Sequence, residues 1–152
     1  MSDEIIDYSK YMTDTFTVDI DEPYDEFLDR ADEFIELLQE LQVWGGAIRE
    51  VWIRKSANGN VHLMIKMKSR HDFLSITMYR ALLGDDPVRI RSDLVKLLKG
   101  QYGVFMQLWD GKIILQNGKR EYRKAGPWHD FFDEAARHKE KLLNRLYDSH
   151  DR

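Results

Sequence analysis

Over residues 15–21, apolar side chains occupy the even positions and polar side chains the odd positions. This alternation predicts a β-strand with one buried and one exposed face. Asp19 and Asp21 fall on the exposed face, where the strand ends before a proline. Two interpretations are open for them: a solvated strand residue followed by a charge near the start of a helix, or two ligands of one metal ion.

After Pro23, apolar residues recur at spacings of three and four up to residue 41. They predict one amphipathic helix with an acidic outer face, which ends at the Trp-Gly-Gly of residues 44–46. Two strands follow over residues 47–55 and 61–67, joined by a loop of hairpin length, Ser-Ala-Asn-Gly-Asn. The polar faces of these strands carry Trp52, Arg54, His62, Met64 and Lys66.

Helical spacing returns in residues 71–84, which end in glycine. Residues 85–100 predict a further helix, with Asp85 or Asp86 as its N-cap and a proline in its first turn. A strand over residues 88–93 is the alternative, because apolar residues alternate there.

The rest of the chain predicts a hairpin and a last helix. Asp-Gly at residues 110–111 and Asn-Gly at residues 117–118 are two-residue turn signals. Amphipathic spacing predicts a C-terminal helix over residues 127–147, whereas residues 1–13 have no period and are expected to form an arm. The expected fold is one α+β domain over residues 1–152. It contains an RRM-like open-faced antiparallel sheet in β-α-β-β-α order, helices on one face, and the C-terminal hairpin and helix.

Composition narrows the classes of protein. The chain has 152 residues with 43% hydrophobic content, which is enough for one core. It contains no cysteine, which excludes disulfides, thiolate nucleophiles and cysteine-ligated metal sites. No apolar run is long enough for a transmembrane helix, and the acidic N-terminal residues do not resemble a secretory signal. We therefore expect a cytoplasmic protein that is not bound to a membrane.

Charge divides the sequence into two unequal parts. Residues 1–42 hold 14 acidic against 2 basic residues, a net of −12, whereas residues 43–152 hold 13 against 21, a net of +8. An ordinary uneven surface is one interpretation. The other is an acidic edge near a metal ion and a basic remainder that faces phosphates.

In chain order, these motifs resemble the catalytic core of the archaeo-eukaryotic primase superfamily, which includes the primase–polymerases of plasmids and viruses. The acid-x-acid pair of that superfamily, at a strand end, is matched by Val-Asp-Ile-Asp at residues 18–21. Its Ser-to-His block is matched by Ser56 and His62, with Gly59 between them. Asn60 replaces one of the usual loop glycines.

A third acid follows the next helix in that superfamily. The Gly-Asp-Asp-Pro of residues 84–87 matches it through Asp86, and Asp93 is the alternative. The resemblance covers about residues 15–95. Members commonly have a larger catalytic region, and the Arg-rich segment that often follows the third motif is matched only loosely.

The resemblance implies metal-dependent nucleotidyl transfer of the DNA primase or polymerase type, in replication of a plasmid, a virus or an archaeal genome. Two divalent ions, Mg²⁺ or Mn²⁺, would bridge the reacting phosphate groups. Their ligands would be Asp19, Asp21 and Asp86, with Asp93 as the alternative third ligand. The residues expected to hold the phosphates of the nucleotide are Arg54, Lys55, Ser56 and His62.

The partners that the resemblance implies are nucleoside triphosphates and single-stranded or primed DNA, with RNA as an alternative, and a helicase or other replication protein supplied separately. Trp52 or Tyr102 would be a stacking surface for bases. If the first and third strands are neighbours, Asp19, Asp21 and His62 should share one open face of the sheet.

Two other functions remain open. One is a non-catalytic nucleic-acid-binding or replication-accessory protein on the same fold. The other is a replication-initiator endonuclease, but such enzymes usually need two metal-binding histidines in a His-x-His pattern, and the third strand offers only His62.

Overall fold

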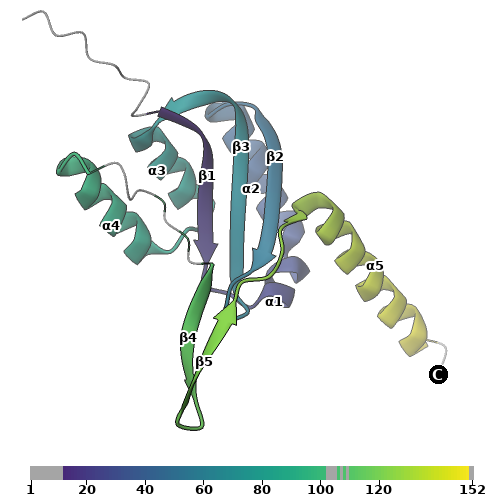
Figure 1. Ribbon diagram of the computed structural model, residues 1–152. Coiled ribbons are helices and arrows are strands. Elements are labelled where there is room, and N and C mark those ends of the chain that lie inside the picture. Colours follow the sequence, from purple (N-terminus) through teal and green to yellow (C-terminus); the bar gives the residue numbers. More distant parts are fainter. Residues whose placement is uncertain (1–11, 102–105, 107, 109, 151–152) are drawn as a thin grey trace, which may run out of the picture.

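The structure is a computed structural model that describes residues 12–101, 106, 108 and 110–150 (Figure 1). Most of the arm expected over residues 1–13, and Tyr102, lie outside the described residues. None of the helices described is long and apolar enough to cross a membrane.

The chain has the predicted α+β class with an antiparallel sheet. A four-stranded sheet has the order β1-β3-β2-β6, and β4 and β5 form a separate two-stranded sheet. The elements in chain order are β1 (Met12–Ile20), α1 (Tyr24–Asp29), α2 (Ala31–Trp44), β2 (Ile48–Lys55), β3 (Val61–Asp72), α3 (Phe73–Leu82), α4 (Pro87–Leu98), β4 (Gly111–Gln116), β5 (Lys119–Lys124), β6 (His129–Asp130) and α5 (Phe131–His150).

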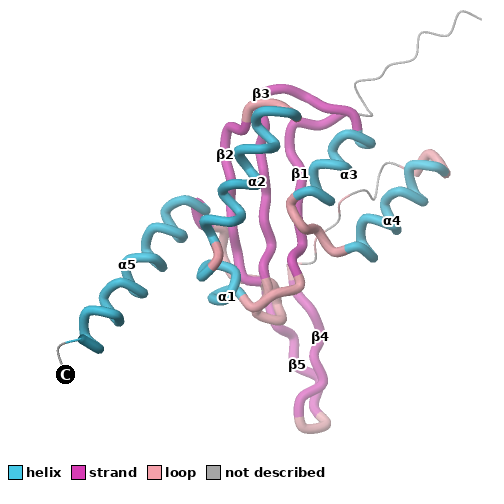
Figure 2. The backbone as a smooth tube through the Cα atoms, turned by 180° about the vertical axis from the view of Figure 1, so that it is seen from behind, coloured by secondary structure: helices cyan, strands magenta, loops and turns pink. Residues whose placement is uncertain are grey.

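The hydrophobic core lies between one face of the sheet and the helices, as the alternation predicts. Figure 2 shows α2 and α3 in front of that face. Alternate residues of the three long strands, such as Phe16, Ile53 and Leu63, are completely buried there. Phe131, at the start of α5, completes the core beside Phe34, with ring centroids 5.4 Å apart. The face opposite the core therefore carries the polar residues of these strands, and Figure 1 views this face.

The prediction of a single helix after Pro23 is wrong, because this segment forms two helices, α1 and α2. α1 and α2 meet at Arg30, whose backbone angles (φ −109°, ψ 27°) interrupt the helix. The guanidinium of Arg30 donates three hydrogen bonds of 2.6–3.0 Å to the carboxylate of Glu22. Apolar spacing continues through the break, because the buried faces of both helices keep the same periodicity.

Residues 87–98 form the helix α4, so the alternative of a strand over residues 88–93 is wrong. Asp86 is the N-cap, and its carboxylate accepts a hydrogen bond of 2.9 Å from the backbone N–H of Val88. Pro87 occupies the first turn, where the absence of an N–H has no cost. Local capping chemistry thus outweighs the short alternation of apolar residues.

The hairpin of β4 and β5 turns at Asn117 and Gly118, as predicted. Both residues have a positive φ, 55° and 75°, which is the backbone of a tight hairpin turn. Asp-Gly at residues 110–111 instead precedes and begins β4. Residues 102–105, 107 and 109, part of the stretch that leads to it, lie outside the described residues.

Candidate active site

The register of the sheet places three predicted residues in one row. β3 lies between β1 and β2, and His62 is paired with Asp19 on one side and with Arg54 on the other. Paired residues of antiparallel strands point to the same face. The neighbouring residues Val61 and Leu63 are completely buried in the core, so the row lies on the face opposite the helices. The first and third strands are therefore neighbours, which is the condition under which Asp19 and His62 share one face of the sheet.

A pocket of about 580 Å³ opens at the end of this row. Four separate segments contribute to it: the end of β1, the loop between β2 and β3 together with the start of β3, the N-cap of α4 and the start of β4. Its lining residues are Asp19, Asp21, Ser56, Ala57, Asn58, Asn60, His62, Asp86, Gly111, Lys112 and Ile113.

Two predicted phosphate-binding cations do not line this pocket. Arg54 lies behind His62 with only 7% of its surface exposed, and its guanidinium also bonds Asp110 at 3.0 Å. Lys55 instead lines a different pocket, with its ammonium group 5.4 Å from the ring centre of Tyr24. Adjacent residues of a strand point to opposite faces, so the two cations could not both face the site.

The hydrogen bond from Arg54 decides which nitrogen of His62 carries the proton. Nε of Arg54 can only donate, and it lies 3.1 Å from Nδ1 of His62. Nδ1 must therefore accept, and the neutral imidazole carries its proton on Nε2. Nε2 lies 3.9 Å from the Oδ1 atom of Asp19, on the side of the pocket. His62 thus presents a neutral hydrogen-bond donor to a ligand.

Burial, and after it the positive charges of Arg54 and Arg89, lower the pKa of His62 to about 4, while Asp110 opposes the shift. The unfolded chain should bind a proton near pH 6.5, whereas the folded chain does so only near pH 4. Between these values the unfolded state binds more protons, so stability falls as the pH falls.

We expect the wild type to lose about 2 kcal/mol more stability between neutral pH and about pH 5 than the variant His62→Gln. Glutamine has an amide in place of the imidazole and does not titrate, whereas every other titrating group is common to both proteins. Urea unfolding of both at a series of pH values measures the difference. Equal losses would contradict a neutral, buried His62.

The electrostatic surroundings of Asp19 favour a cation. Burial raises the pKa of Asp19; Arg89 opposes this, and the negative charges of Asp85, Asp86 and Asp21 raise it further. The side chain remains 34% exposed and lines the pocket. Carboxylates that raise one another's pKa in this way would be relieved by a bound divalent ion.

Asp21 is linked to the loop between β2 and β3 by Asn60. Nδ2 of Asn60 donates a hydrogen bond of 2.9 Å to Oδ1 of Asp21. The backbone N–H of Asn60 donates to Oγ of Ser56 at 3.0 Å. Asn60 thus connects Asp21 to Ser56: a glycine could keep the backbone bond to Ser56 but would lack the side-chain bond to Asp21.

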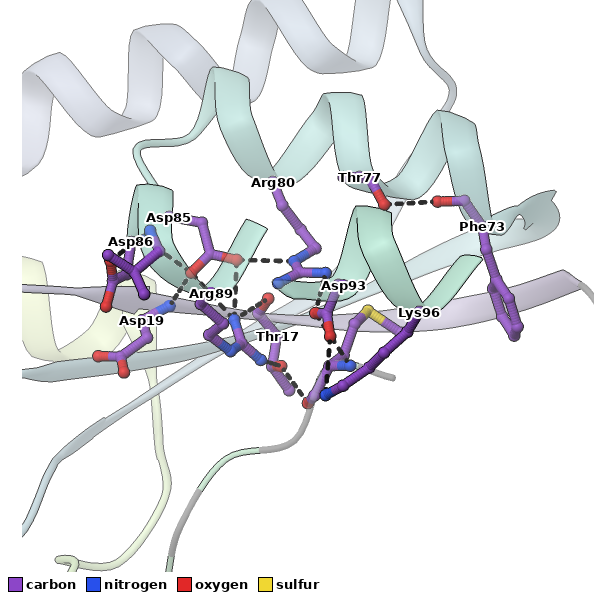
Figure 3. A network of polar contacts seen from close by, with 12 residues as sticks. Thr17, Asp19, Phe73, Thr77, Arg80, Asp85, Asp86, Arg89, Asp93 and Lys96 are labelled. Carbon is purple, nitrogen blue, oxygen red and sulfur yellow. Dashed lines mark hydrogen bonds and ion pairs between the residues drawn. The ribbon is translucent and has the colours of Figure 1, made fainter. Parts of the chain in front are cut away.

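Asp85 is a site residue that sequence reasoning treated only as a possible helix cap. Its carboxylate is buried, and its Oδ1 atom accepts hydrogen bonds from the backbone N–H groups of Asp19 and Asp86, at 2.9 and 2.8 Å (Figure 3). The N–H of Asp86 also lies 2.8 Å from the carbonyl oxygen of Asp19. Asp85 therefore fixes the end of β1 and the start of α4 to one another, which sets the positions of two pocket carboxylates.

Arg80, which is buried, and Arg89, which is partly buried, neutralise the charge of Asp85, and Arg80 also neutralises Asp93. Nε of Arg80 lies 2.6 Å from Asp85, and its Nη1 lies 2.8 Å from Asp93. Arg89 contacts Asp85 at 2.8 Å and donates to the carbonyl oxygen of Thr17 at 3.1 Å. A signal for Arg80 exists in the sequence, since it falls on the apolar face of α3, four residues after Ile76 and three before Leu83.

Asp93, the alternative third ligand, does not line the pocket. Only 2% of its surface is exposed, and it accepts a hydrogen bond from the backbone N–H of Met106 at 3.2 Å in addition to its contact with Arg80. Of the two candidates, the geometry favours Asp86.

In the part of the chain that the structure describes, no group of three histidine or acidic side chains is arranged so that it could hold a metal ion as it stands. Asp19, Asp21 and Asp86 nevertheless line one pocket, and carboxylate oxygens are the ligands that Mg²⁺ and Mn²⁺ prefer. Their donor chemistry fits these ions, and rotation of the side chains would be needed to bring them together.

No protein-family model matches the chain, and neither the curated proteins nor the solved structures that were compared with it gave a match. The interpretation of the pocket consequently depends on its own residues.

Proposed function

We propose that this chain is a metal-dependent nucleotidyltransferase of the DNA primase–polymerase type, built on an RRM-like sheet. The observation that supports the proposal most is the convergence of Asp19, Asp21, Ser56, His62 and Asp86 on one pocket. These residues come from three segments that are far apart in the sequence. Strand pairing and the contacts of Asp85 explain why these segments meet, but they do not require that carboxylates, a hydroxyl and an imidazole face one pocket.

In this proposal Asp19, Asp21 and Asp86 hold the divalent ions. Such ions would supply positive charge that stabilises the negative charge developing on the phosphates during transfer. His62 donates the Nε2 proton to a phosphate oxygen, and the hydrogen bond from Arg54 keeps that tautomer in place. Being neutral, His62 contributes to orientation more than to charge. The 56–60 loop offers further donors close by, including the Ser56 hydroxyl.

A non-catalytic nucleic-acid-binding role in replication is the second candidate. One observation favours it over the enzymatic proposal: among the described residues, the acidic side chains are not arranged as a set of metal ligands. A replication-initiator endonuclease is the third candidate, and it receives less support because the residue two positions after His62 on the same face of β3 is Met64, not a second histidine.

Metal-dependent nucleotide binding tests the proposal. We expect labelled dATP or ATP to bind the wild type with Mn²⁺ or Mg²⁺ and to be released by EDTA. In Asp86→Asn this binding should weaken by about tenfold or more, because a carboxylate ligand is lost. Asparagine is as good an N-cap as aspartate, so the unfolding midpoint should hardly change.

Lys55→Gln is a matched control, because it removes a charge from the neighbouring pocket instead. It should leave nucleotide binding within about twofold of the wild type. Absence of any metal-dependent nucleotide binding by the wild type would remove the enzymatic proposal and leave the accessory role.

A further inference from the structure

The hairpin of β4 and β5 is a basic arm that projects from the body of the protein. Figure 1 shows both strands extending past the end of the four-stranded sheet. Residues 111–124 contain five lysines and arginines and one glutamate, a net charge of +4, although the whole chain carries −4. The basic residues are Lys112, Lys119, Arg120, Arg123 and Lys124.

One face of this hairpin combines exposed apolar and aromatic groups with positive charge. The register pairs Ile113 with Tyr122 and Leu115 with Arg120, so these four side chains share a face. Ile113, Leu115 and Tyr122 are 65%, 73% and 64% exposed. No second layer of structure covers these side chains. Neighbouring exposed apolar residues of this kind commonly mark a surface that binds a partner.

Tyr122 lies at the base of the hairpin, beside the pocket. A Cβ atom added to Gly111 would collide with the hydroxyl and the ring of Tyr122, so the ring lies directly over this glycine. Gly111 and Ile113 line the pocket that contains Asp19 and His62. The aromatic ring therefore stands between the exposed length of the arm and the candidate active site.

The base of the hairpin is fixed to the four-stranded sheet. Asp110 bonds Arg54 at 3.0 Å, and its carbonyl oxygen accepts from the backbone N–H of Ala125 at 2.6 Å. The N–H of Gly126 donates to the carbonyl oxygen of Lys55 at 2.9 Å. The base of the arm thus holds a defined position relative to the pocket.

We propose that the hairpin of β4 and β5 binds single-stranded nucleic acid and leads it to the pocket. The charge of the arm suits a polyphosphate backbone, and the exposed ring of Tyr122 offers a surface on which an unpaired base can stack. A duplex would satisfy the charge equally well, but its bases are already stacked on one another. The destination of the strand rests on the proposed function, whereas binding by the arm does not.

Fluorescence anisotropy with a labelled single-stranded oligonucleotide tests the arm. The triple variant Lys119→Gln/Arg120→Gln/Lys124→Gln should bind at least tenfold more weakly at about 0.1 M salt. The slope of log K against log salt should become shallower by about two, since each lost phosphate contact removes about 0.7. Tyr122→Ala should weaken binding about tenfold, and Tyr122→Phe should bind nearly as the wild type.

The matched control removes the same charge from exposed positions on α5, in Lys139→Gln/Lys141→Gln/Arg145→Gln. It should bind the oligonucleotide within about threefold of the wild type. Equal losses in the two triple variants, equal affinity of a blunt duplex, or retention of binding in Tyr122→Ala would each overturn the proposal. Binding of anionic vesicles in preference to the oligonucleotide would overturn it as well.

Nucleotide binding separates this inference from the proposed function. The hairpin variants should keep the metal-dependent binding of dATP, because none of the substituted residues lines the pocket. The wild type and all variants could lack dATP binding while oligonucleotide binding still depends on the hairpin. That result would exclude the proposed function and support the binding of nucleic acid by the arm. If the hairpin variants bind the oligonucleotide as the wild type does, the arm fails and the proposed function remains.

Discussion

Replacing Arg80 with methionine should destabilise the protein by about 3–5 kcal/mol, one of the largest losses available from a single substitution outside the apolar core. Arg80 is completely buried and neutralises two buried carboxylates, Asp85 and Asp93. Methionine fills much of the same volume, so the loss would come from charge and not from a cavity. The midpoint of urea unfolding at neutral pH measures it.

Two controls decide whether the cause is uncompensated charge. The triple variant Arg80→Met/Asp85→Asn/Asp93→Asn removes the stranded charges and should recover part of the lost stability. Arg137→Met breaks an exposed ion pair with Glu134 and should cost less than about 1 kcal/mol. If Arg80→Met were no worse than Arg137→Met, the buried network would not be a source of stability.

The sequence could predict the face of the sheet on which each strand residue of the site lies, but not the order of the strands. Alternation over residues 15–21 and 61–67 placed Asp19 and His62 on the polar faces of their strands, because the side-chain period of a strand is two whatever its neighbours are. The pairing of β1 with β3 was a condition, not a prediction. Strand order depends on contacts between distant segments, and no local pattern records them.

The choice between Asp86 and Asp93 shows where local reasoning stops. Both acids lie in the same segment: Asp86 is the N-cap of α4, and Asp93 follows about two turns later. What separates them is Arg80, which binds Asp93 in the interior and leaves Asp86 at the pocket. The partner that determines the role of Asp93 lies 13 residues earlier, on another helix.

Arg54 and Lys55 are a case in which the local pattern, the alternation of side chains along β2, predicts the outcome but the expected function contradicts it. The alternation that assigned Arg54 to the polar face required its neighbour to face away. Function-based reasoning placed both cations on the phosphate, because a triphosphate attracts positive charge. Lys55 lies beside Tyr24 in a different pocket. The face of the strand on which a residue lies therefore predicts its surroundings better than its charge does.

Asp19→Asn should abolish template-directed nucleotide addition, with a loss on the order of a thousandfold or more, and should leave the folded protein no less stable. The amide keeps the shape of the carboxylate and loses the negative charge that a divalent ion needs. At neutral pH in EDTA the wild type bears the cost of an ionised, partly buried carboxylate near Asp85, Asp86 and Asp21. Asparagine removes that cost, so the unfolding midpoint should stay or rise.

The sign of the pH dependence provides a check on this explanation. Burial raises the pKa of Asp19 in the folded state above the unfolded value. As the pH falls through the raised pKa, the wild type becomes neutral at this position, and any stability advantage of Asp19→Asn should shrink. Urea unfolding of both proteins at neutral and at acidic pH, without metal, measures this.

Primer extension with Mn²⁺ or Mg²⁺ measures the loss of activity, and Asp21→Asn should lose activity comparably. Asp14→Asn is a matched control, since it removes a carboxylate from the same strand at a position that does not line the pocket. Loss of activity together with unchanged or increased stability is the pattern expected of a residue that serves chemistry at a cost to the fold. Extension by Asp19→Asn at a rate close to that of the wild type would exclude Asp19 as a metal ligand, and catalysis would then have to depend on other residues.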